Sequence, residues 1–350
     1  MPVLSRQARN RVGQLLLAMA GLVVLPGSAS CDDRDPQWFP LRNNNPILQV
    51  YGLPRFQGGT LVADGEFQYS VGLDIANHAD SGTTDSESMV FDGESYFLSL
   101  SGRYGASRWL ELGIDVPLVL HTDGIFDNAI ESWHDLWGMS NSKRSGPANQ
   151  LRFFYGAAST PAFELTKRSF GIGDIQLTAA IPVRRPDATS RTALSLRSGV
   201  KIPTGEASTL RGSGAVDFSL GLFASHSRSL SNRDLRLTGF AGVLLPGEGD
   251  LFPALQRSSV AFGGLGASWQ LTEKFSIAAQ TYAQGSYLKS DLDEIGGNSI
   301  QLAIGGNYRL RGKRIELAFS LVEDVLSDAT ADVALHFSVR GYSKSRGIEP

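Results

Sequence analysis

The chain has 350 residues, a formal net charge of −3 and one cysteine. A mildly acidic balance without a basic run gives no support for nucleic-acid binding, and a single cysteine excludes an intramolecular disulfide. Hydrophobic residues make up 42% of the chain and the mean hydropathy is close to zero, which is compatible with a membrane β-barrel because its strands alternate apolar and polar residues.

The first thirty residues predict a secretory signal peptide. Three arginines precede an apolar stretch over 15–25, and small residues follow over 27–30. This stretch is shorter than the roughly twenty residues of a membrane-spanning helix, so cleavage near residue 30 is expected. Cleavage would remove three arginines and no acidic residue, so the net charge would fall from −3 to −6. Cys31 comes directly after this region, which leaves its lipidation as an alternative.

Alternation of apolar and polar residues decides the fold class. Over 110–120 every second residue is Leu, Ile or Val, whereas Glu111 and Asp115 lie on the opposite face. A period of two is typical of a strand that faces two different environments. Runs of this kind predict about twelve strands, most of them long enough to cross a bilayer at a tilt, over 59–75, 93–104, 108–120, 172–183, 191–202, 214–226, 233–245, 258–271, 274–288, 298–310, 313–323 and 331–342.

The connections between these strands alternate in length. Short turns such as 105–107, 272–273 and 311–312 separate longer connections, of which 121–170 is the longest. Outer-membrane barrels have short periplasmic turns and longer extracellular loops. The pattern therefore predicts an all-β protein, a transmembrane up-and-down antiparallel β-barrel of about twelve strands with both termini in the periplasm. A soluble sandwich or lipocalin-like fold is the alternative.

The predicted organisation follows from these elements. A signal peptide over 1–30 precedes a periplasmic N-terminal segment over 31–57. The barrel covers 58–342, including the long loop 121–170, and a C-terminal tail covers 343–350. After export, this barrel is expected in the outer membrane, in contact with its lipids.

The polar face of the strands would line the barrel lumen. It carries side chains of both signs, which could neutralise one another or line a passage for a small solute. A barrel of about twelve strands is intermediate between filled eight-stranded barrels and open sixteen-stranded porins. The lumen-facing candidates are Asp64, Glu66, Asp74, Glu111, Asp115, Asp174, Arg197, Lys201, Asp217, Arg236, Arg309, Arg314, Glu316, His336 and Arg340.

The long loop contains a stretch with helical spacing. Its apolar residues recur at i, i+4, i+7 and i+11, which predicts a short amphipathic helix. This helix could pack as a plug in the barrel mouth, rest on the membrane interface or line a ligand site. Its candidate residues are Phe126, Ile130, Trp133, His134 and Trp137.

The sequence contains no recognisable catalytic, cofactor-binding or metal-binding motif. None of its five histidines has the sequence context of an outer-membrane lipase, and HExxH, CxxC and Walker motifs are missing. We therefore expect no catalytic residue, no cofactor and no metal. Three functions remain: a passive channel or transporter for a small or hydrophobic solute, a closed structural or surface-interaction barrel, and, as a minor alternative, a lipid-modifying enzyme.

Several segments together resemble a known family. They are NPILQVYGLP over 45–54, LELGIDVPLVLH over 110–121, GIFDNAIESWHDLWG over 124–138 and KIPTGEASTLRGSGAVD over 201–217. This chain resembles the proteobacterial "domain of unknown function 3187" proteins over most of its mature length. The resemblance implies an outer-membrane barrel. The family has no assigned activity, so the resemblance implies no catalytic residue.

Overall fold

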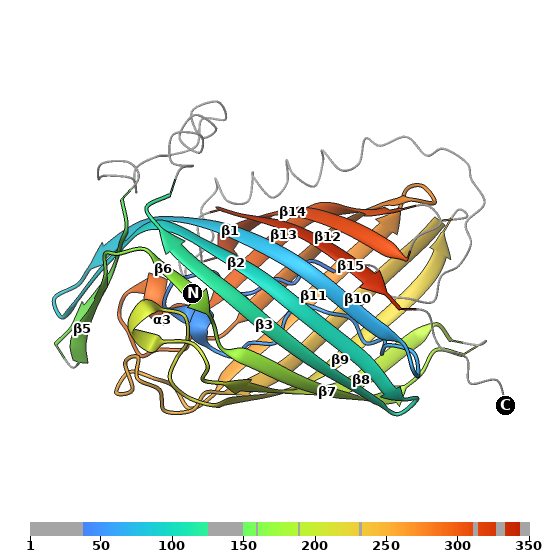
Figure 1. The fold of residues 1–350 in the computed structure, drawn as a ribbon, viewed down its shortest axis with the longest axis horizontal. Coiled ribbons are helices and arrows are strands. Elements are labelled where there is room, and N and C mark those ends of the chain that lie inside the picture. Colours follow the sequence, from blue (N-terminus) through green and yellow to red (C-terminus); the bar gives the residue numbers. More distant parts are fainter. Residues whose placement is uncertain are drawn as a thin grey trace.

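Twelve antiparallel strands form a closed barrel (Figure 1). The computed structural model describes residues 38–124, 150–158, 160–187, 190–230, 233–310, 314–326 and 333–343. Neighbours along the chain pair in order, and the first and last strands close the sheet. The barrel strands are β1 Phe67–Thr83, β2 Glu87–Ser107, β3 Leu110–Thr122, β7 Ile175–Arg184, β8 Thr192–Ile202, β9 Asp217–Leu230, β10 Arg233–Leu245, β11 Val260–Gln270, β12 Phe275–Gln284, β13 Ser299–Arg309, β14 Ile315–Leu326 and β15 Val333–Tyr342.

The remaining elements of the described residues are short. β4 (Arg152–Ala157) pairs with the start of β2 and with β5 (Thr160–Leu165), which extends the sheet beyond the barrel. β6 (Ser169–Ile172) pairs with β3 just ahead of β7, so β6 and β7 together form one interrupted wall strand. Three single-turn helices are η2 Leu48–Val50, η3 Ala207–Thr209 and α3 Asp293–Gly296. Among the described residues, no helix has the length and apolarity needed to cross a membrane.

The predicted all-β barrel of about twelve strands is confirmed, with one displaced element. The first strand was predicted over 59–75, whereas β1 begins at Phe67 and runs to Thr83. Residues 59–63 instead contact the inner wall through backbone groups, and Asp64 makes only an isolated bridge to Gly105. Their local alternation is therefore that of a short extended segment, which sequence pattern alone does not distinguish from a wall strand.

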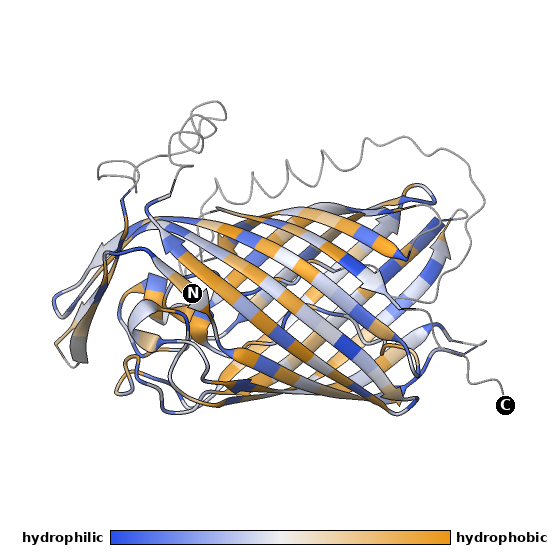
Figure 2. Ribbon diagram, viewed as in Figure 1, coloured by the Kyte–Doolittle hydropathy of each residue, from blue (hydrophilic) through white to orange (hydrophobic). Residues whose placement is uncertain are grey.

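The strands have two distinct faces, as the alternation predicted. On β9, Phe218, Leu220 and Leu222 are exposed, whereas Asp217 and Ser219 are buried. The same alternation of apolar and polar residues runs along neighbouring strands (Figure 2). A bilayer satisfies the apolar outer rows, and closure of the sheet leaves no wall-strand edge for hydrocarbon to contact.

The two ends of the barrel differ. Antiparallel pairing places the connections 203–216, 246–259 and 285–298 at one end, which we call the long-loop end. The turns 108–109 and 271–274 lie at the other, which we call the short-turn end. Exposed aromatic side chains gather near the short-turn end, as expected of an interfacial girdle. They are Phe67, Tyr69, Tyr104, Trp109, Phe275 and Tyr308.

The apolar outer face makes a stability prediction. Leu265 lies in the middle of β11 and is 69% exposed. In lipid vesicles, Leu265→Arg should lower the free energy of unfolding by about 2–4 kcal/mol, because it places a cation near the bilayer centre. Leu245→Arg, at the end of β10, should cost only about 0–1 kcal/mol. Urea titrations in vesicles measure both, and equal losses would contradict a membrane around this face.

Candidate functional site

The lumen is occupied by the chain's own N-terminal residues. Residues 38–63, which we call the lumen segment, run inside the barrel, visible as the dark blue trace behind the front strands (Figure 1). Phe39 and Ile47 are fully buried, and Leu48 and Phe56 are nearly so. The described part of 31–57, the range predicted as a periplasmic N-terminal segment, is packed against the inner wall.

Wall side chains provide hydrogen bonds to the backbone of the lumen segment. Because this backbone is largely irregular, its buried N–H and C=O groups need partners from elsewhere. Gln280 bonds both backbone groups of Phe39, with its Oε1 3.1 Å from the amide nitrogen and its Nε2 2.5 Å from the carbonyl oxygen. Further bonds join Gly59 N to Ser225 Oγ, Val62 N to Glu111 Oε2, Arg197 Nη2 to Thr60 O and Tyr282 Oη to Pro54 O.

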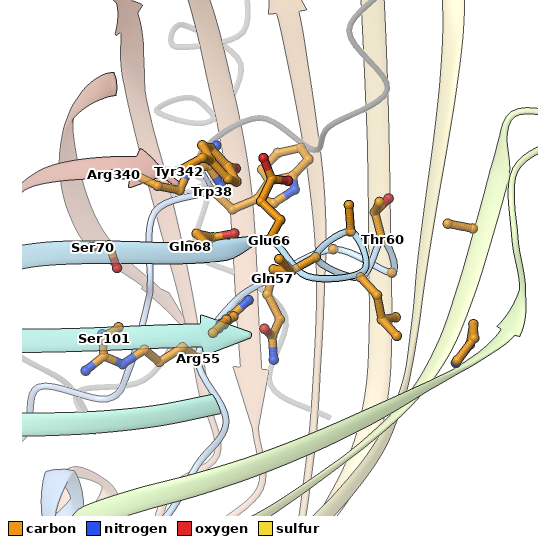
Figure 3. Close-up of a pocket in the computed structure, with 18 of the residues that line it drawn as sticks. Trp38, Arg55, Gln57, Thr60, Glu66, Gln68, Ser70, Ser101, Arg340 and Tyr342 are labelled. Atoms are coloured by element: carbon orange, nitrogen blue, oxygen red, sulfur yellow. The ribbon is translucent and has the colours of Figure 1, made fainter. Parts of the chain in front are cut away.

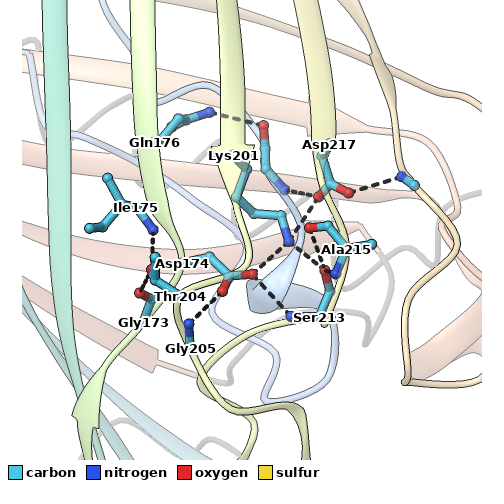
Figure 4. Close-up of polar contacts among 12 residues, drawn as sticks. Gly173, Asp174, Ile175, Gln176, Lys201, Thr204, Gly205, Ser213, Ala215 and Asp217 are labelled. Atoms are coloured by element: carbon cyan, nitrogen blue, oxygen red, sulfur yellow. Dashed lines mark hydrogen bonds and ion pairs between the residues drawn. The ribbon is translucent and has the colours of Figure 1, made fainter.

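A buried lysine joins the wall, a loop and the lumen segment near the long-loop end (Figure 4). Lys201 Nζ lies 2.6 Å from Asp174 Oδ2 and 3.3 Å from Asp217 Oδ2, and it also bonds Ser213 Oγ. Asp217 Oδ2 accepts a bond from the amide of Gly52, 2.8 Å away. These carboxylates therefore serve two purposes, because they balance the lysine charge and hold the irregular backbone.

Other charged side chains pair across the inside of the wall. Arg197 Nη1 lies 2.6 Å from Glu111 Oε1, and both side chains are almost completely buried. Arg340 bonds Glu316 from the neighbouring strand. Asp74 Oδ1 lies 2.6 Å from His336 Nδ1, and His336 Nε2 lies 2.9 Å from Ser338 Oγ. Each of these inward charges thus has a partner of opposite sign or a hydrogen-bonding partner.

A cavity of about 650 Å³ remains near the short-turn end (Figure 3). Apolar side chains such as Trp38 and Phe56 form part of its lining, together with the acidic residues Asp64, Glu66 and Asp115. A smaller cavity of about 50 Å³ lies on the other side of the lumen segment, and Arg55 and Asp115 line both cavities. Six arginines line the larger cavity, which therefore has a positive balance: Arg55, Arg103, Arg108, Arg184, Arg185 and Arg340.

The structure places the predicted lumen residues unequally. Arg236 and Arg309 are half-buried. Arg314 is exposed and pairs with Glu66, with 2.6 Å between Nη1 and Oε1, and Asp64 is also exposed. The loop-helix candidates Phe126, Ile130, Trp133, His134 and Trp137 lie outside the described residues. The buried members are Glu66, Asp74, Glu111, Asp115, Asp174, Arg197, Lys201, Asp217, Glu316, His336 and Arg340.

Sequence reasoning missed the residues of the lumen segment and their uncharged partners on the wall. Arg55 was not considered, although its Nη1 lies 3.1 Å from Ser101 Oγ and 3.6 Å from Asp115 Oδ1. Gln280 is uncharged, so a search for charged inward residues passes over it. The available signal was the apolar run over 47–53, which is too hydrophobic for a solvated linker. Among the described residues, no group of three or more His, Cys, Asp or Glu side chains could hold a metal ion.

Comparison with solved structures identifies the fold. The COG4313 outer membrane channel from Pseudomonas putida F1 has a TM-score of 0.53 at 13% identity, covering 81% of this chain and 98% of that chain. The NanC porin follows at 0.43 and 9% identity, covering 79% and 98%. The transport unit of the autotransporter AIDA-I from Escherichia coli also scores 0.43, at 10% identity, covering 80% and 90%. The first match shows the fold of an outer-membrane β-barrel.

Sequence comparisons give the family. A search of curated proteins finds no match. One family model, described as "Protein of unknown function (DUF3187)", matches residues 14–342, almost the entire chain. The resemblance expected from the sequence motifs is confirmed, and the chain belongs to the DUF3187 family.

Proposed function

We infer that this protein is an outer-membrane passage for small solutes that its lumen segment keeps closed. The observation that carries this inference is the packing of residues 38–63 inside the barrel. These residues contribute no strand to the sheet and contact the wall through side-chain bonds. Moving them requires breaking those bonds and exposing apolar side chains, while every strand pairing of the wall stays intact.

The incomplete hydrogen bonding of the lumen segment supports its displacement from the lumen. Within the described part of the chain, several of its buried polar atoms have no protein hydrogen-bond partner, among them Arg55 Nε and Nη2, Asn44 Oδ1 and Gln49 Oε1. Each unsatisfied buried group costs about 1–3 kcal/mol. The closed arrangement is therefore less favourable than its packing alone suggests, which lowers the free energy needed to move the segment.

The cavity suggests what kind of solute would pass. Its volume of about 650 Å³ falls within the range of small-molecule sites, about 300–1,000 Å³. Because six arginines and three acidic residues line it, a small solute with a negative charge fits better than a cation. The P. putida protein of similar fold is a channel by name, which agrees with passage as the function.

The proposal also fixes an orientation. Signal-peptide cleavage near residue 30 would leave the lumen segment close to the mature N-terminus. With short turns in the periplasm and long loops outside, the arginine-lined cavity would face the periplasm. The Lys201 cluster and the smaller cavity would then lie towards the cell exterior.

A closed structural barrel is the second candidate, and one observation favours it. The lumen segment buries many apolar side chains in the same hydrophobic cluster as the wall. Full burial of each such side chain is worth about 1.5–3 kcal/mol. If the free energy gained by this burial always exceeds the cost of the unsatisfied polar atoms, the lumen segment stays in place and the barrel stays closed.

A reversible disulfide distinguishes the two candidates. A Cβ at Gly52 would lie 3.1 Å from the Cβ of Asp217 and 2.9 Å from that of Lys201. A shift of the lumen segment by a few tenths of an ångström therefore gives Gly52→Cys and Asp217→Cys the spacing of a disulfide, which should crosslink the lumen segment to β9. Cys31 is replaced by serine so that only this pair can form. In planar bilayers, the oxidised protein should stay closed, and reduction of the same sample should restore intermittent openings.

The oxidised and reduced forms are matched controls for each other, because they share every residue. The Cys31→Ser protein alone should show openings that the reductant does not change. If this control and the reduced protein both stay silent to ions and small anions, passage is excluded and the structural barrel is favoured.

A further inference from the structure

Closure of the barrel brings an aspartate of the first strand next to a histidine and a serine of the last strand. His336 and Ser338 are two residues apart on β15, so both face the lumen. Asp74 lies directly opposite His336 on β1, and Gly72 lies opposite Ser338. The His336 Nδ1–Asp74 Oδ1 distance is 2.6 Å, and the His336 Nε2–Ser338 Oγ distance is 2.9 Å.

The direction of these hydrogen bonds follows from their chemistry. An ionised carboxylate only accepts, so Asp74 requires the proton of a neutral imidazole to sit on Nδ1 of His336. Nε2 then has a free lone pair and accepts the hydroxyl proton of Ser338. This is the arrangement of a serine nucleophile, a general base and an orienting carboxylate.

The serine adjoins a cavity, whereas the other two side chains do not line it. All three side chains are buried, with Ser338 7%, Asp74 6% and His336 1% exposed, but Ser338 alone of the three lines the cavity of about 650 Å³. His336 also faces the ring of Phe39, with 6.4 Å between the ring centroids. Because Gly72 has no side chain, the space beside Ser338 stays open: an added Cβ would lie 3.7 Å from the Cβ of Ser338.

We propose that Ser338, His336 and Asp74 form an acyl-transfer centre inside the barrel, which hydrolyses small carboxylic esters carrying a negative charge. Ser338 and His336 are the catalytic residues, and Asp74 is a positioning residue that acts through His336. This activity is independent of passage, since it requires entry into the cavity and no transit across the membrane.

The lining of the cavity defines the substrate class. Arg340 follows Ser338 by two residues and therefore lies on the same face of β15. Arg55 and Arg103 line the same cavity, as do Trp38 and Phe56. Arginines favour an anionic group and the negative charge that develops on a carbonyl oxygen, whereas the aromatic rings favour an acyl chain. The cavity lies within the lumen, so a solute fits it better than a lipid held in the bilayer.

The reaction balances without a cofactor. Ser338 Oγ bonds to the ester carbonyl carbon as its proton passes to His336 Nε2. The bond to the alcohol oxygen then breaks, and that oxygen leaves with the proton. Water attacks the acyl carbon, gives a proton to Nε2, and the carbon–Oγ bond breaks as Oγ regains that proton. One ester and one water give one carboxylic acid and one alcohol.

A second serine–histidine pair provides an internal comparison. Ser95 Oγ lies 2.9 Å from His121 Nδ1 and 3.2 Å from His78 Nε2. Ser95 is fully buried, and it lines neither the cavity of about 650 Å³ nor that of about 50 Å³. A hydrogen-bonded serine without adjoining space should not react with a soluble reagent.

Labelling with diisopropyl fluorophosphate tests the proposal on the full mature protein in detergent. This reagent is small and transfers its phosphoryl group to activated serines with loss of fluoride. Peptide mass spectrometry should locate the adduct on Ser338, and Ser338→Ala should remove it. Ser70→Ala, on β1 in the same cavity, and Ser95→Ala should leave labelling unchanged.

Variants of the other two residues test their roles. His336→Gln should slow labelling by about 10²–10⁴-fold, the usual contribution of a general base. Asp74→Asn should slow it by up to about 10⁴-fold, and Asp74→Glu should restore part of the rate. A purely structural role for Asp74 would leave the labelling rate of the folded Asp74→Asn barrel unchanged.

Two labelling results would overturn the proposed acyl-transfer centre. A folded wild-type barrel that forms no Ser338 adduct at millimolar reagent over hours would overturn the proposal. Labelling of Ser95 or Ser70 at an equal rate would also overturn it, because reactivity would not depend on His336. Turnover of a small anionic nitrophenyl ester, lost in Ser338→Ala, extends the test to catalysis. The adduct is measured in detergent and passage is measured as openings in planar bilayers, so this test is separate from that of passage.

Discussion

Replacing Gly59 by valine should raise the open probability of the barrel in planar bilayers by about 5–30-fold, which corresponds to about 1–2 kcal/mol. Gly59 lies where the backbone of the lumen segment comes close to the backbone of the wall. A Cβ there would be 2.6 Å from the carbonyl oxygen of Phe223 and 2.9 Å from that of Ala193. These are backbone atoms of paired strands, so the segment must move instead of the wall.

The same substitution weakens a hydrogen bond. The amide of Gly59 donates to Ser225 Oγ at 2.9 Å, and a displaced segment loses this bond, which is worth about 0.5–1.5 kcal/mol. Gly285→Ala is the matched control, since a Cβ at Gly285 would meet no described atom nearer than 3.6 Å. An open probability equal to that of the control would argue against displacement of the lumen segment as the opening step.

Replacing Lys201 by methionine should lower the free energy of unfolding by about 3–5 kcal/mol, because removing one partner leaves uncompensated buried charge. The lysine side chain is 3% exposed, and those of Asp174 and Asp217 are 4% and 0% exposed. Asp174 also accepts bonds from the amides of Gly205 and Ser213, so the loss should spread to the loop after β8. This loss is measured by urea unfolding of the vesicle-inserted protein, with tryptophan fluorescence as the signal.

Two further variants make this stability prediction specific. Adding Asp174→Asn to Lys201→Met should recover part of the loss, since one unpaired charge is removed. Arg152→Met breaks the exposed pair with Glu164, in which both side chains are nearly half exposed, and should cost at most about 1 kcal/mol. A Lys201→Met loss as small as that of Arg152→Met would contradict the structural importance of the buried cluster.

Local pattern predicted the wall of this barrel well because each strand has one apolar and one polar side. The alternation over 110–120 identifies β3, and the buried Glu111 and Asp115 follow from the same parity. Alternating connection lengths predicted the barrel topology, since antiparallel strands place successive connections at opposite ends. These signals are local in sequence and need no knowledge of distant partners.

The contents of the lumen could not be predicted in the same way. Residues 59–63 alternate like a strand, yet they bond to Ser225 and Glu111, which are more than forty residues further along the chain. Asp74 and His336 were both predicted to face inward. Their contact, however, depends on the register in which β1 pairs with β15, and the two residues are 262 positions apart in the sequence. His336 and Ser338 lie close together in the sequence, but the arrangement also needs Asp74 from the first strand, which no local motif can supply.

The position of the lumen segment has a consequence for the order of assembly. Phe39 is bonded to Gln280 across 241 residues, and it precedes the strand that closes the barrel against β15. A segment that is already in place when β1 and β15 pair is enclosed as the seam forms. Insertion of the barrel and closure of its lumen are then a single event, and its long-range contacts are of the kind that form slowly. Such an order of assembly would spare the membrane an open hole in the newly inserted barrel.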